Sequence, residues 1–162
     1  MYQVYTRFFQ VVVVAGPAYS VGDMNTPIRT FNARDINRIR GFLDLAVRRQ
    51  GGPKFKTLES LSRELASSTI VEPQEMPGDV VTMRSRVLLH YPATGTQEEF
   101  ELVYPADADI SQRRVSLLAP LGAALLGHKK GTMVEYPAPA GVLQVEIVDV
   151  LYQPEAAGDF DA

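Results

Sequence analysis

The side chains best suited to acid–base or metal chemistry are two histidines and two neighbouring aspartates. His90 and His128 are the only histidines, and they lie far apart in different sequence patterns. Asp107 and Asp109 lie in a run typical of a loop, where paired carboxylates can bind Mg²⁺ or exchange protons. No third ligand, base or phosphate-binding loop accompanies either pair. We therefore expect structural histidines, a solvated aspartate turn, no metal, no cofactor and no enzymatic activity.

The composition excludes further kinds of site. The chain has 162 residues and no cysteine, which rules out disulfides, zinc–thiolate sites and cysteine nucleophiles. A chain without cysteine fits a reducing compartment. No apolar run approaches the roughly 20 residues that a membrane-spanning helix needs. We expect a cytoplasmic protein with no membrane partner.

Charge is divided unevenly along the chain. Residues 24–70 carry nine Lys/Arg and four Asp/Glu, a net charge of +5, whereas residues 71–162 carry six and 14, a net charge of −8. This asymmetry predicts a basic module on an acidic body. The cations follow a helical pattern without interleaved aromatic residues, so we do not expect sequence-specific binding of nucleic acid.

Residues 1–29 form an N-terminal extension that differs from the rest. Residues 8–14 form a brief apolar run that is rich in valine and interrupted by Gln10, and Gly16-Pro17 follow it. A short signal peptide and an additional edge strand both fit this run. We favour a third interpretation, in which Met24 is the true start, because residues 24–27 open like an ordinary N-terminus and helix signals follow.

Residues 30–70 predict two helices joined by a short loop. The first helix should begin near Asn32, a good N-cap residue, and end at the breaker formed by residues 50–53. About 17 helical residues would span about 25 Å. The second helix should start after Thr57 and have an apolar face of Leu58, Leu61 and Leu65. Helices joined so closely run antiparallel, as an αα-hairpin.

Residues 75–162 predict a small α+β domain. Turns rich in Pro and Gly separate strand-like runs at 80–83, 87–89, 100–104, 115–118, 132–136 and 142–152. Five or six strands with a single short helix are typical of an antiparallel α+β fold.

The run 115–131 predicts a strand, a short helix and a basic turn. Val115 and Leu117 alternate with Ser116 as in a half-buried strand, and Pro120 suits the first helical position. Gly127 stands where a left-handed residue ends a helix. Between them, one apolar helix face is formed by Leu121, Ala124 and Leu125.

Four motifs, in this order, resemble the Gre family of transcription factors, and within it the Rnk branch. They are EMPGDVVTMRSRV (75–87), LVYPA (102–106), APLGAALLG (119–127) and YQPEAAGD (152–159). The resemblance covers residues 75–160 closely and residues 30–70 as an architecture, and it omits residues 1–23. It implies an N-terminal antiparallel coiled-coil hairpin and a C-terminal FKBP-like domain.

The resemblance also implies a partner and a docking site. Gre factors bind the rim helices of the RNA polymerase secondary channel through the strand-to-helix corner. Here that corner contains Ser116, Leu118, Ala119 and Pro120. Ser116 and Pro120 match the pattern of cleavage factors, whereas Leu118 replaces an acidic residue.

The tip of the hairpin argues against transcript cleavage. Cleavage-stimulating Gre factors carry acidic tip residues that help to hold a catalytic Mg²⁺. Residues 48–56 contain no carboxylate and four cations, Arg48, Arg49, Lys54 and Lys56. Cations cannot ligate Mg²⁺, which takes oxygen ligands. We therefore predict a regulator of the Rnk type that docks on the polymerase, competes with Gre factors and does not stimulate cleavage.

Two alternatives stay open at the level of sequence. An FKBP-like domain is compatible with peptidyl-prolyl isomerase activity, although such a site needs an aromatic-lined cavity and the chain has no Trp. The helical hairpin is also compatible with an adaptor that binds a helix of a protein other than the polymerase.

Overall fold

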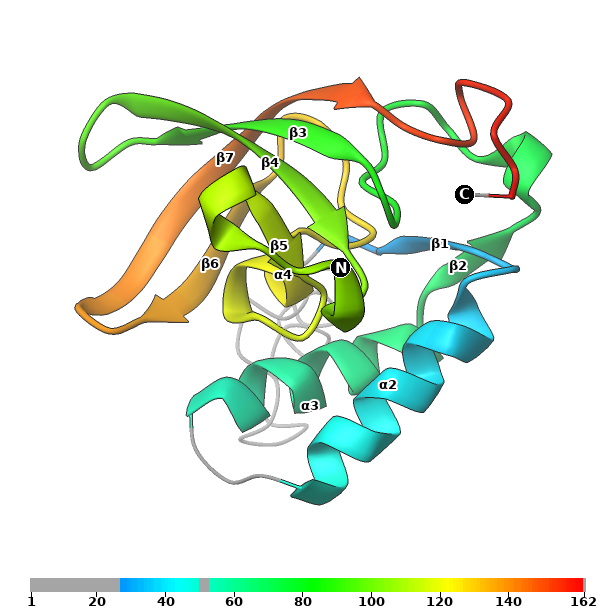
Figure 1. Cartoon of the computed structure of the whole chain (residues 1–162), viewed down its shortest axis with the longest axis horizontal. Coiled ribbons are helices and arrows are strands. Elements are labelled where there is room, and N and C mark those ends of the chain that lie inside the picture. The colour runs from blue at the N-terminus through cyan, green and yellow to red at the C-terminus, as the bar shows by residue number, and fades with distance from the viewer. Residues whose placement is uncertain (1–26, 50–52, 162) are drawn as a thin grey trace, which may run out of the picture.

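The computed structural model describes residues 27–49 and 53–161 (Figure 1). The interpretations of residues 1–23 and of Met24 as the start concern residues outside this part. The elements, in chain order, are β1 (Thr30–Asn32), α2 (Ile36–Arg49), α3 (Pro53–Ala66), β2 (Thr69–Val71), β3 (Arg86–Tyr91), β4 (Thr96–Val103), β5 (Arg114–Ser116), α4 (Pro120–Leu125), β6 (Met133–Ala138) and β7 (Gly141–Tyr152). The predicted α+β class is confirmed.

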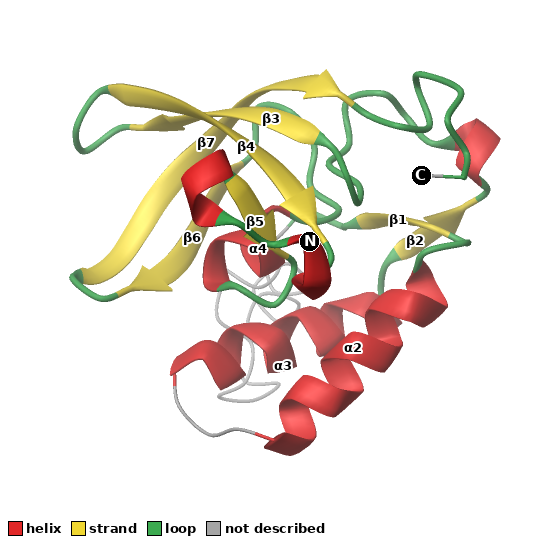
Figure 2. Cartoon of the chain, in the orientation of Figure 1, coloured by secondary structure: helices red, strands yellow, loops and turns green. Residues whose placement is uncertain are grey.

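The main sheet has five strands in the order β5-β4-β3-β7-β6 and curls around α4 (Figure 2). Three strand pairs are antiparallel, as predicted, but β4 and β5 are parallel. The prediction of a wholly antiparallel sheet was therefore wrong at one edge, where β5 lies parallel to β4. The chain between these two strands contains two short 3-10 turns, η3 (Pro105–Asp107) and η4 (Ile110–Gln112), which carry it back to the start of the neighbouring strand.

The strand predicted at residues 80–83 is a buried turn. Val80 makes a single bridge to Lys129, and Arg84 ends the segment with a left-handed φ of 63°. Val80 and Val81 are fully buried. Their β-branched side chains therefore reflect burial in the core and not pairing in the sheet.

Both hairpin helices begin elsewhere than predicted. Residues 30–32 are extended because β1 pairs in parallel with β2, with Asn32 opposite Val71. The Asn32 side chain accepts a hydrogen bond from the Arg34 backbone N–H at 2.8 Å, and α2 starts after Asp35. Conversely, α3 starts before Thr57, at Pro53, which suits a first helical turn. Each helix has 14 residues and spans about 21 Å, less than the expected 25 Å.

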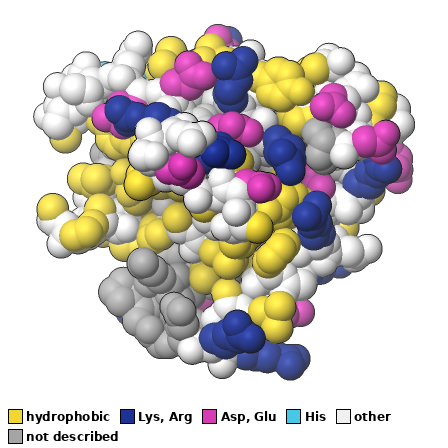
Figure 3. Space-filling view, in the orientation of Figure 1, with side chains coloured by type: hydrophobic (Ala, Val, Ile, Leu, Met, Phe, Trp, Pro, Cys, Tyr) yellow, Lys and Arg dark blue, Asp and Glu magenta, His cyan; other side chains and the backbone are white. Residues whose placement is uncertain are grey.

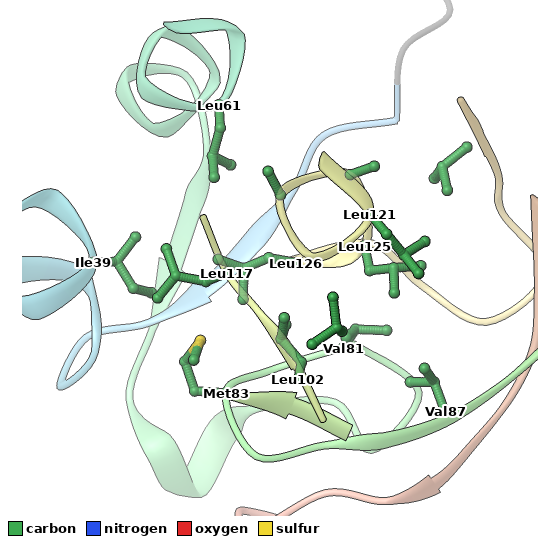
Figure 4. Close-up of a cluster of buried hydrophobic side chains, with 14 of the residues drawn as sticks. Ile39, Leu61, Val81, Met83, Val87, Leu102, Leu117, Leu121, Leu125 and Leu126 are labelled. Carbon is green, nitrogen blue, oxygen red and sulfur yellow. The ribbon is translucent and has the colours of Figure 1, made fainter. Parts of the chain in front are cut away.

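One hydrophobic cluster runs from the hairpin into the sheet (Figure 4). Ile39 of α2 and Leu61 of α3 point toward Leu117 and Leu126, which flank α4. These four side chains are at most 1% exposed. The hairpin therefore packs its apolar stripe on the residues around α4 and not only on itself.

Candidate functional site

The β5–α4 corner is organised by the backbone and hydroxyl of Ser116. Its Oγ accepts the backbone N–H of Leu118 at 3.1 Å, and its carbonyl accepts that of Ala119 at 3.0 Å. Leu117, between them, donates its N–H to Val103 of β4 at 3.0 Å and is fully buried. The chain therefore turns sharply around one serine, as Ser side chains favour in tight turns.

The helix after this turn begins as the sequence predicts. Ala119 is the N-cap residue with extended backbone, Pro120 occupies the first turn, and Ala119 accepts the N–H of Ala123 at 2.9 Å. Gly127 has the predicted left-handed conformation, with a φ of 82°. Pro120 and Gly127 therefore delimit a helix of six residues.

The four predicted docking residues lie together on the surface of this corner. Ser116, Leu118, Ala119 and Pro120 are all partly exposed, and none is charged. Leu118 and Ala119 also pack against the hydrophobic cluster. The corner is thus a small, mainly apolar ledge with a hydrogen-bonded backbone.

Tyr104 joins this ledge to α2. It follows β4, whose last residue pairs with Ser116, and its hydroxyl donates to Asp35 at 2.9 Å. The Arg38 guanidinium lies 3.9 Å above its ring, and the ring centroid of Phe42 lies at 5.6 Å. Tyr104 belongs to the motif LVYPA, but the sequence does not reveal its role, because its hydrogen-bond partner Asp35 lies 69 residues earlier.

The electrostatics of this cluster follow from burial. Burial raises the pKa of Tyr104, and the nearby Asp35 carboxylate adds to the rise. Burial also raises the pKa of Asp35, although the hydrogen bond from Tyr104 and the two nearby arginines lower it. A neutral tyrosine that donates to a partly desolvated carboxylate is a stable arrangement over the ordinary pH range.

The hairpin tip carries the predicted cations where the structure describes them. Arg48 and Arg49 end α2 and are exposed, and Lys56 is exposed in the first turn of α3. Lys54 lies in the same turn, but its side chain and residues 50–52 are outside the described part. Dark-blue side chains gather over this end of the molecule in Figure 3.

The residues first considered for acid–base or metal chemistry are not brought together. His90 lies 3.5 Å from Glu146 on the sheet, whereas His128 is buried beside the end of α4. Asp107 pairs with Arg84 at 3.3 Å, and Asp109 caps η4 through Ser111. Residues 27–49 and 53–161 contain no group of three metal-ligating side chains.

The side of the sheet that faces α4 is filled. Leu121 and Leu125 belong to the same buried cluster as Val87, Leu102 and Ile147 of the strands (Figure 4). An isomerase of the FKBP kind would need an open aromatic cavity at this face, so its packing disfavours that alternative. Within the described part of the chain, no helix is long and apolar enough to cross a membrane.

Comparison with known proteins decides the family. A model described as the C-terminal part of the transcription elongation factors GreA and GreB matches residues 64–152. The regulator of nucleoside diphosphate kinase from Escherichia coli K12 is 37% identical over 138 residues, which are 85% of this chain and 98% of that protein. The chain belongs to the GreA/GreB family. The resemblance proposed from its four motifs is confirmed.

Two further relatives support this membership. Transcription elongation factor GreA from Syntrophus aciditrophicus is 30% identical over 130 residues, 76% of this chain and 81% of that protein. The solved structure of a prokaryotic transcription elongation factor GreA/GreB from Nitrosomonas europaea is 37% identical. The two structures match with a TM-score of 0.62, and the match covers 78% of this chain and 100% of the Nitrosomonas chain.

In this GreA/GreB family member, the family model covers one part of the candidate site and leaves out the other. Residues 64–152 include the whole β5–α4 corner and Tyr104, but none of the four tip cations. The corner therefore belongs to the part that the family model describes, whereas the tip lies outside that part.

Proposed function

We propose that this chain is a transcription regulator of the same type as the regulator of nucleoside diphosphate kinase. It binds RNA polymerase at the rim helices of the secondary channel, competes there with Gre factors and does not stimulate transcript cleavage. It binds no specific nucleic-acid sequence, and it acts in the cytoplasm, where the polymerase is.

The observation that carries the docking proposal is the hydrogen-bonded β5–α4 corner. Ser116 holds the turn with two hydrogen bonds, and α4 starts directly after it, so the ledge is preorganised for a partner. Its apolar character suits packing against helices, and Leu118 supplies the largest apolar side chain.

The charge of the tip and the short reach of the hairpin both support the absence of cleavage activity. No carboxylate occurs among residues 48–56, so the tip offers no acidic side chain to hold a catalytic Mg²⁺. Helices of 14 residues also limit the projection of the tip to about 21 Å from the base of the hairpin. The FKBP-like domain and the coiled-coil character of the hairpin remain parts of this proposal.

The decisive experiment is competition with a Gre factor for core RNA polymerase. We expect this chain to displace a labelled Gre factor and to leave the transcript of a stalled complex uncleaved. Leu118→Lys should weaken displacement about tenfold or more, because it places a charge on an apolar ledge. Val142→Lys is the control, since Val142 is 68% exposed near the start of β7. Failure to compete would overturn the docking proposal.

A further inference from the structure

Arg29 joins the hairpin to the end of α4. It is 8% exposed, and its Nε donates to Glu64 of α3. Its Nη1 donates to the carbonyl of Ala123 at 2.6 Å and to that of Leu126 at 2.9 Å. One guanidinium thus bridges two helices that are far apart in sequence.

The chemistry of this bridge suits arginine and no other residue. The last carbonyls of a helix have no partner within the helix, and a cation is favourable at that end. The planar guanidinium presents several fixed donors, so it satisfies two carbonyls and a carboxylate at once. Burial lowers the pKa of Arg29 while Glu64 opposes this change, and an arginine keeps its proton under such conditions.

The backbone around Arg29 brings the base of the hairpin against α4. Thr30 donates its N–H to the Gly127 carbonyl at 2.9 Å, and Thr69 donates to the Arg29 carbonyl at 2.9 Å. A Cβ at Gly127 would lie 3.0 Å from the Arg29 Cβ and 3.1 Å from the Phe31 ring. The segment before α2, at Arg29 and Thr30, therefore lies against the end of α4, and the segment after α3, at Thr69, is bonded to it.

The polar contacts of the two hairpin helices differ. Two contacts hold the chain just before α2. Tyr104 donates a hydrogen bond to Asp35, and Arg34 forms an ion pair with Asp161 near the C-terminus at 2.9 Å. In the part of α3 that the structure describes, Glu64 makes the only side-chain hydrogen bond to a residue beyond the hairpin helices. The direction of α3 thus depends on Arg29 and on apolar packing, which is less directional.

We propose that Arg29 is a positioning residue that sets the angle of the hairpin relative to the β5–α4 corner. α4 starts in that corner and, at six residues, is only about 9 Å long. Only the short helix α4 and the Arg29 side chain therefore separate the β5–α4 corner from α3. The angle controls where the basic tip lies. The effect of that position on polymerase binding rests on the proposed function, whereas the role of Arg29 in setting the angle does not.

Distance measurement in the free protein tests the angle. The chain has no cysteine, so spin labels can be placed at Lys56→Cys on α3 and Gln97→Cys on β4, both exposed positions. Arg29→Met should at least double the width of the distance distribution. Arg29→Lys should give an intermediate width, because one ammonium cannot replace the fork. Arg63→Gln, in the exposed pair with Glu59 at 3.9 Å, should change nothing.

A folded Arg29→Met protein with the wild-type distribution would overturn the proposal. If that variant does not fold, Glu64→Gln replaces it, because the amide removes the charge while keeping one oxygen acceptor. Glu64→Gln should broaden the distribution detectably, and an unchanged width in that variant would also overturn the proposal.

Polymerase binding separates this inference from the proposed function. Charge reversal at Arg48 and Arg49 should weaken binding in the wild type, and the effect should be at least about threefold smaller in Arg29→Met, as a double-mutant cycle measures. An equal effect in both backgrounds would overturn the link between angle and tip. No polymerase binding in any variant would overturn the proposed function and leave the distance result standing.

Discussion

The carbonyl oxygen of Ser116 occupies the space where a side chain at Gly122 would begin. A Cβ built on Gly122 lies 2.0 Å from that oxygen and 2.8 Å from its carbon, far inside van der Waals contact. The first turn of α4 thus rests directly on the backbone of β5. This approach keeps the helix tight against the strand and defines the shape of the ledge that Leu118 and Pro120 present.

Gly122→Ala should therefore distort the corner. The methyl group meets backbone, which cannot rotate away, so we expect a loss of about 2–3 kcal/mol in the free energy of unfolding. Polymerase binding should fall with it. Denaturant titration measures the first effect and the competition assay the second.

Gly41 supplies the matched control for that substitution. It lies in α2, and a Cβ there would meet no atom within 4 Å. Gly41→Ala should stabilise the protein by up to about 1 kcal/mol, because alanine is the better helix former. Equal effects at both glycines would contradict the tight approach of α4 to Ser116.

Tyr104→Phe should weaken the contact between α2 and the sheet. Loss of one hydrogen bond to a partly buried carboxylate costs about 1–2 kcal/mol. The same hydrogen bond lowers the pKa of Asp35, so its removal should raise that pKa further. Carboxyl NMR titration measures the shift, and Tyr152→Phe is the control, since no described residue is a hydrogen-bond partner of its hydroxyl. An unchanged Asp35 titration would show that the contact is absent in solution.

His128 should make the protein sensitive to acid. Burial, reinforced by the Arg29 cation, lowers the pKa of His128 to about 3 from its ordinary 6.5. Between those values the unfolded chain binds more protons than the folded one, so stability contributed by the neutral imidazole is lost as pH falls below about 6.5. The slope is at most about 1.4 kcal/mol per pH unit.

His128→Gln should flatten this part of the stability curve. Unfolding free energies of both proteins between pH 4 and pH 7 give the comparison, and the difference between the curves isolates His128 from the carboxyl groups. Parallel curves would mean that the histidine is not held neutral by its burial.

The basic tip should bind an acidic surface of the polymerase. Reversal of Arg48, Arg49, Lys54 and Lys56 to glutamate should weaken binding and reduce its dependence on salt, because exposed charges act through screened attraction. Affinity measured at several ionic strengths tests this. Unchanged affinity would exclude a role for the tip in docking.

The sequence alone determined the local features that depend on near neighbours. Pro120 and Gly127 marked the ends of α4, and the apolar stripes of residues 30–70 predicted two helices. The four motifs were sufficient to recognise the family. Each of these signals arises from residues that lie close together in the chain, where backbone preferences and periodicity act directly.

Features that depend on distant partners emerge only when the chain is folded. Asn32 reads as a helix cap, but pairing with Val71 makes it a strand residue. Val80 and Val81 read as a strand but lie buried in a turn. Tyr104 and Arg29 acquire their roles from Asp35 and from the end of α4. Long-range burial and hydrogen bonding outweigh local propensity at these positions, because they contribute more free energy than the propensities that they oppose.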